Sequence, residues 1–148
     1  MQIIDNFIPL YYQDKLELLL SSNQVPYFYS DDTININNTD TYFKDTNTIN
    51  SIQFTHLLIE NDKVNSNFYS DISRIIYKLE DILNIPCTVL RCKINLNVFA
   101  GNTVDQYNYP HIDTTNPKAI TAIYYVNTSD GNTVFFDKKY GSIIQKVE

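Results

Sequence analysis

The residues best suited to chemistry in this sequence are His111 and Asp113, which are separated by a single residue. In an extended segment, positions i and i+2 point to the same side, so an imidazole nitrogen and a carboxylate oxygen can reach one metal ion. A second histidine would complete the 2-His-1-carboxylate set that holds non-haem Fe(II) and leaves positions open. No histidine follows residue 111. The triplet therefore predicts two of three ligands, and the alternative is a strand-end histidine hydrogen-bonded to its aspartate neighbour or to solvent.

The other potential metal ligands have less favourable patterns. His56 lies inside the sequence QFTHLLI, which favours a core or loop histidine with satisfied hydrogen bonds. Cys87 and Cys92 are close together in one extended stretch, but their side chains face opposite sides and form no metal-binding pair. Two such cysteines fit a reducing compartment, which predicts a cytoplasmic protein.

Length and charge bound the class of protein. The 148 residues, of which 43% are hydrophobic, suffice for an apolar core, and residues 1–148 are expected to form a single, incomplete domain. The formal net charge of -6 disfavours nucleic acid as a partner, because non-specific binding to phosphates needs a basic surface. The chain has no basic leader and no apolar run near the roughly 18 residues of a membrane span, so no membrane contact is expected.

The elements that must position the triplet are mostly strands. Apolar residues recur at three- and four-residue spacing over 67–84, which predicts a helix, and Pro9 opens another helix through about Leu20. Alternation of apolar and polar residues over 90–98 predicts a long strand with one core face. Residues 119–126 are almost continuously apolar, as in a buried strand. Further strands are expected at 2–8, 25–29, 52–59, 133–136 and 142–147, with loops at 31–51 and 101–109.

This pattern predicts an α+β protein, mainly β, whose strands form a barrel or jelly roll. Four segments then carry a resemblance in order: LRCKINL at 90–96, HID at 111–113, TAIYYVN at 121–127 and DGNTVFF at 130–136. They resemble the Fe(II)/2-oxoglutarate-dependent dioxygenases, in particular the prolyl-4-hydroxylase-like branch, and IDNFIP at 4–9 is similar to the way that branch often starts. The resemblance implies a double-stranded β-helix core with flanking helices.

The resemblance also implies roles for particular residues. His111 and Asp113 would bind Fe(II), and Tyr125 would donate a hydrogen bond to the distal carboxylate of the co-substrate 2-oxoglutarate. Tyr107 and Tyr109, next to the triplet, suit stacking on a peptide or a ring. Ascorbate is a candidate accessory reductant. The expected reaction is hydroxylation of a C–H bond in a protein, a peptide or a small molecule, with a peptidyl prolyl residue as one candidate.

The chain departs from the family pattern in four respects. Phe99 stands near a position where related enzymes often carry a tyrosine, and the second histidine ligand and the basic residue after it are missing. The final core strands would then also be absent, so a second chain or another copy would have to cover an open barrel edge. Asp105, Asp137 and His56 are weak candidates for a third ligand. The alternative function is a non-catalytic remnant of a β-barrel that acts as a binding or structural module.

Overall fold

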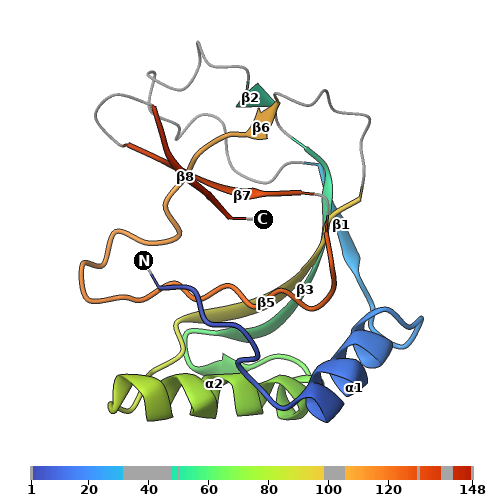
Figure 1. The fold of residues 1–148 in the computed structure, drawn as a ribbon. Coiled ribbons are helices and arrows are strands. Elements are labelled where there is room, and N and C mark those ends of the chain that lie inside the picture. The colour runs from blue at the N-terminus through green and yellow to red at the C-terminus, as the bar shows by residue number, and fades with distance from the viewer. Residues whose placement is uncertain are drawn as a thin grey trace. The chain divides into compact units, whose positions relative to one another are not determined.

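A computed structural model describes residues 2–31, 48–49, 51–98, 106–129, 131–137 and 142–147. These residues form two helices and eight short strands in three separate sheets, a mixed α/β arrangement (Figure 1). The chain divides into two compact units. The first comprises Met1–Phe28 with Phe54–Leu96, and the second comprises Tyr29–Gln53 with Asn97–Glu148.

Strand β3 (Gln53–Glu60) organises the four-stranded sheet, because every other strand of that sheet joins it. The strands β1 (Phe28–Ser30), β4 (Lys63–Val64) and β5 (Arg91–Leu96) are its partners. A tight turn at Asn61 and Asp62 connects β3 to β4, and both residues have the positive φ angles, 50° and 61°, that two-residue hairpin turns require. The predicted strands at 52–59 and 90–98 are confirmed.

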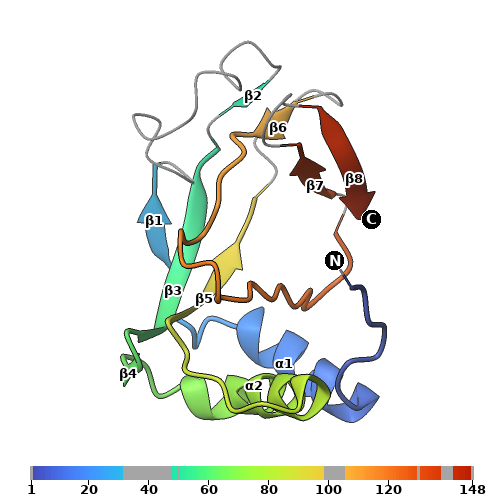
Figure 2. The ribbon, with the colours of Figure 1, turned by 90° about the vertical axis from the view of Figure 1, so that its left-hand side faces the viewer.

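Both predicted helices are present, and Figure 1 and Figure 2 show them on one face of this sheet. Helix α1 (Leu10–Leu20) starts after Pro9 and buries every fourth residue on one face, namely Tyr12, Leu16 and Leu20. Helix α2 (Tyr69–Leu83) buries Ile72 and ends at Asn84, which has the left-handed conformation of a helix C-cap. Among the described residues, neither helix is long and apolar enough to cross a membrane.

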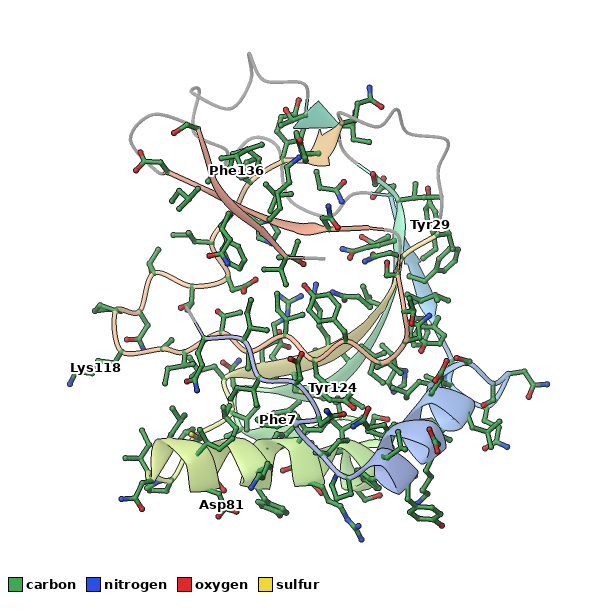
Figure 3. All side chains as sticks on the ribbon, viewed as in Figure 1. Phe7, Tyr29, Asp81, Lys118, Tyr124 and Phe136 are labelled. Atoms are coloured by element: carbon green, nitrogen blue, oxygen red, sulfur yellow. The ribbon has the colours of Figure 1, made fainter. Side chains whose placement is uncertain are left out.

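The described residues of the second unit form only short strands. Strand β2 (Thr48–Ile49) pairs in parallel with β6 (Tyr107–Asn108). Strand β7 (Thr133–Phe136) pairs antiparallel with β8 (Ile143–Val147), which confirms the two strands predicted at the end of the chain. Phe136 of β7, labelled in Figure 3, packs its ring edge-on against Tyr107 of β6 at a centroid distance of 5.9 Å.

Two strand predictions are wrong. Residues 2–8 contain a turn at Asp5 and Asn6, and the positive φ of Asn6 interrupts an extended backbone. Residues 119–126 form no strand, because the described part of the chain offers them no strand partner, and Ile120 and Ile123 are 58% and 60% exposed.

The described sheets do not close into a barrel, so the jelly roll is not confirmed. The coarser prediction of mixed helices and strands, with strands in the majority, is confirmed. Most of the loop predicted at 31–51, and residues 101–105 of the next predicted loop, lie outside the described residues.

Candidate metal centre

His111 and Asp113 lie together in the second unit, in a segment that belongs to no strand. The His111 Nε2 atom is 3.7 Å from Asp113 Oδ1, and 47% and 52% of the two side chains are exposed. On the other side of the ring, Nδ1 is 3.3 Å from the backbone carbonyl oxygen of Tyr109. Because a carbonyl oxygen only accepts, this contact is a hydrogen bond when Nδ1 carries the proton, and in that tautomer of the neutral ring Nε2 has the lone pair.

The spacing of these two atoms is close to that of two ligands on one divalent metal ion. Nitrogen and oxygen ligands lie about 2.0–2.2 Å from a metal such as zinc, so two ligands at right angles are about 3 Å apart. The observed separation of 3.7 Å is longer than this value, so the two exposed side chains would have to move closer to bind one ion. In the tautomer with the proton on Nδ1, a nitrogen lone pair faces a carboxylate, and a cation or a proton between them makes the contact attractive.

Among the described residues, no third ligand accompanies the pair. No three His, Cys, Asp or Glu side chains within the described ranges are close enough together to hold a metal ion. Asp137 follows β7, and its backbone N–H donates to the Ser142 carbonyl oxygen at 2.7 Å. Asp105, Phe99 and the Asp130 of the resemblance lie outside the described residues.

Tyr125, the residue expected to orient the co-substrate, is held by a side chain of β7. Its hydroxyl group is hydrogen-bonded to the Thr133 hydroxyl, and the residue is 48% exposed. Burial raises the pKa of the neighbouring Tyr124, so this phenol stays neutral at pH 7. Because the Tyr125 hydroxyl can donate a hydrogen bond and the residue is exposed, Tyr125 is still a candidate donor. Its role toward 2-oxoglutarate stays a prediction.

Tyr107 and Tyr109 differ in what holds them. The Tyr107 hydroxyl accepts a hydrogen bond from Lys146 Nζ at 2.7 Å, and the same ammonium group lies 5.0 Å from the centre of the ring. Tyr109 acts through its backbone, because its N–H donates to the Ile49 carbonyl oxygen at 3.1 Å while its own carbonyl oxygen contacts His111. Tyr109, which was predicted as a substrate contact, therefore also orients His111, the candidate metal ligand. The sequence did not indicate this second role.

His56 is a buried histidine with satisfied hydrogen bonds, as predicted. It is 6% exposed, its Nδ1 lies 2.8 Å from the Pro26 carbonyl oxygen, and its Nε2 lies 2.7 Å from Ser66 Oγ. These partners leave neither ring nitrogen available for a metal. Sequence analysis missed Ser66, although a serine shortly before an amphipathic helical pattern is a recognised signal for the start of a helix.

Comparisons of the chain with protein-family models, with curated protein sequences and with solved structures gave no match. Assignment of a function therefore rests on the sequence motifs and on the geometry of His111 and Asp113.

Proposed function

We propose that the chain contributes the metal-binding segment of an Fe(II)- and 2-oxoglutarate-dependent hydroxylase whose complete fold is a double-stranded β-helix. The observation that carries the proposal is the orientation of His111. Its Nδ1–H is directed to the Tyr109 carbonyl oxygen, so the Nε2 lone pair faces the Asp113 carboxylate. A backbone carbonyl that fixes the tautomer in this way is a common partner of a metal-bound histidine. The four-segment resemblance supports iron and 2-oxoglutarate over other metals and co-substrates.

The bound iron and 2-oxoglutarate would supply oxidative decarboxylation coupled to hydroxylation of a C–H bond. His111 and Asp113 would hold the ion through one nitrogen and one oxygen, and the carboxylate would neutralise part of its charge. The Tyr109 carbonyl oxygen would keep the imidazole in the tautomer that exposes Nε2. A third ligand from outside the described residues would complete the set.

The aromatic residues near this pair would bind the organic molecules. Tyr125 would turn its hydroxyl from Thr133 toward the distal carboxylate of 2-oxoglutarate, because a carboxylate is the stronger acceptor. Tyr107, whose ring already contacts the Lys146 ammonium group, suits a flat or cyclic side chain such as proline. A protein or peptide substrate is the proposed class, with a small molecule as its competitor.

The second candidate function is a non-catalytic binding module, and one observation favours it. The apolar segment 119–126 has no strand partner in the described structure and exposes Ile120 and Ile123 to solvent. An extended apolar segment with unpaired backbone groups can add to the edge of a sheet in another chain. Under this proposal the partner would be a second copy or another protein, and His111 with Asp113 would have no metal-dependent role.

Metal titration distinguishes the two candidates. Co(II) should bind the wild-type chain with a visible absorption band, and Fe(II) should compete for the same site. Replacing Asp113 with Asn removes one of two charged or basic ligands and should weaken the affinity for Co(II) about tenfold or more. Asp81→Asn is the matched control, since it makes the same charge change on an exposed residue of α2.

Catalysis needs a separate measurement. The chain is incubated with Fe(II), 2-oxoglutarate, ascorbate and O2, and succinate is assayed in the wild type and in His111→Ala. Succinate above the His111→Ala level supports the hydroxylase. Equal Co(II) affinity in wild type and Asp113→Asn, together with no succinate above the control, would remove the enzymatic proposal and leave the binding module.

A further inference from the structure

A continuous series of hydrogen bonds in the first unit runs from Phe68, just before helix α2, to Pro26, just before β1. The Phe68 backbone N–H donates to Ser66 Oγ at 3.2 Å, and Ser66 Oγ lies 2.7 Å from Nε2 of His56. The opposite ring nitrogen, Nδ1, lies 2.8 Å from the Pro26 carbonyl oxygen. Three segments distant in sequence therefore meet at one buried imidazole.

In this series of hydrogen bonds, the carbonyl oxygen of Pro26 determines which group donates at each step when the imidazole is neutral. The Pro26 oxygen can only accept, so Nδ1 of the neutral ring carries the proton and Nε2 is the acceptor. The Ser66 hydroxyl must then donate its proton to Nε2. A serine whose hydroxyl proton points at a neutral, oriented imidazole is the arrangement by which a general base activates a nucleophile. The carbonyl oxygen of Pro26 takes the place of the third, orienting group.

The surroundings of Ser66 can accept a small apolar molecule. An open hollow of about 610 Å³ is lined by His56 and Ser66, by apolar side chains that include Phe28, Leu57 and Phe68, and by the polar side chains of Asn65 and Asn67. Phe28 is stacked on the imidazole at 6.5 Å and is itself 65% exposed, while Phe68 meets the same ring edge-on at 5.6 Å. Ser66 is half-buried and is one of the residues that line this hollow.

Ser66 also lies just before helix α2, whose first backbone N–H groups carry partial positive charge. The N–H of Phe68, the residue just before the helix, contacts Ser66 Oγ at 3.2 Å. The first three helical N–H groups are bonded to the carbonyl oxygens of Ser66, Asn67 and Phe68. The helix dipole and the Phe68 N–H lower the cost of negative charge on the serine oxygen. The helix terminus thus adds to the nucleophile, the base and the hollow that the other contacts provide.

From these contacts we propose that Ser66 and His56 form a nucleophile–base pair that hydrolyses small esters with short apolar acyl groups, independently of the metal pair. Ser66 Oγ attacks the carbonyl carbon while its proton passes to His56 Nε2. The carbon–oxygen bond to the alcohol breaks, and the alcohol leaves with the proton from Nε2. Water, deprotonated by His56, then attacks the acyl-serine, releases the acid and returns the proton to Ser66.

A fluorophosphonate probe tests the pair in the intact wild-type chain. The folded protein should gain one adduct, and peptide mass spectrometry should place it on Ser66. The adduct should disappear after heat denaturation, because the imidazole then no longer contacts the hydroxyl. Hydrolysis of p-nitrophenyl butyrate should fall about 100-fold or more in Ser66→Ala, in line with the loss of an activated nucleophile.

Ser70→Ala is the matched control. Ser70 lies on the first turn of α2, is exposed, and donates its hydroxyl to the Asn67 carbonyl oxygen at 3.1 Å. This variant should keep wild-type ester hydrolysis and wild-type labelling at Ser66. The wild-type labelling result stands even if Ser66→Ala fails to fold. Absence of an adduct on Ser66, or equal hydrolysis in folded Ser66→Ala, would overturn the proposal and leave the hydrogen-bond chain as a purely structural link.

Discussion

Replacing Leu16 and Leu18 with Ala, one at a time, tests how the first unit is held together. Both residues belong to helix α1, and the two substitutions change helix propensity equally. They differ in burial, because Leu16 is 1% exposed and Leu18 is 77% exposed. The difference between the variants therefore measures what the buried face of α1 contributes to the free energy of unfolding.

The expected size of the effect follows from this burial. Removing three carbon atoms from a fully buried leucine loses about 2.4 kcal/mol of transfer free energy, taken as about 0.8 kcal/mol for each carbon. A residual cavity of about 40 Å³ adds about 1 kcal/mol. Leu16→Ala should thus destabilise the first unit by about 3 kcal/mol, whereas Leu18→Ala should change the unfolding free energy by less than about 0.5 kcal/mol.

Urea denaturation followed by far-ultraviolet circular dichroism measures both variants. With a slope of about 2 kcal/mol per molar urea, Leu16→Ala should lower the midpoint by roughly 1.5 M. The midpoint of Leu18→Ala should stay near that of the wild type. Equal losses in the two variants would refute the assignment of the buried and exposed faces of α1.

Three further predictions concern single groups. Burial raises the pKa of the Cys92 thiol, so the unfolding free energy should be constant below the unfolded thiol pKa of about 8.5, then fall as pH rises toward the folded pKa. Cys92→Ala should reduce that fall in urea titrations at stepped pH. The buried Ser51 hydroxyl has no hydrogen-bond partner among the described residues, so Ser51→Ala should raise the unfolding free energy by about 1 kcal/mol in thermal melts. Asn84 has φ 54° at the end of α2; Asn84→Ala should cost about 1 kcal/mol by urea titration and Asn84→Gly should not.

The elements that sequence analysis predicted correctly have a regular period. Helix α2 shows apolar residues at helical spacing, and β5 shows strict alternation, so local geometry alone identifies which residues share a face. The same reasoning failed at 119–126, where an apolar run predicts burial but a strand also needs a partner for its backbone groups. Whether a neighbouring strand is present depends on segments distant in the sequence, so no local sequence pattern predicts it.

The candidate sites differ in the same way: contacts between near neighbours in the sequence were predictable, and contacts that depend on the fold were not. The pairing of His111 with Asp113 was predictable, because two positions in one extended segment determine it. The contact between His56 and Ser66 was not, since it depends on how β3 and the segment before α2 are placed by the sheet and the hairpin between them. The backbone role of Tyr109 was also invisible, because any residue type supplies a carbonyl oxygen.

The left-handed turn at Asn61 and Asp62 has a consequence for the order of folding. Ile59 of β3 pairs with Val64 immediately after this turn, and with Cys92 only after the whole of α2. A hairpin closes in about 1–10 μs, whereas the longer loop to β5 pays a larger closure entropy before any pairing is gained. The contact between β3 and β4 should therefore nucleate the sheet, and β5 should join it last. In kinetic terms, substitutions at the turn will slow refolding, while substitutions in β5 will mainly accelerate unfolding.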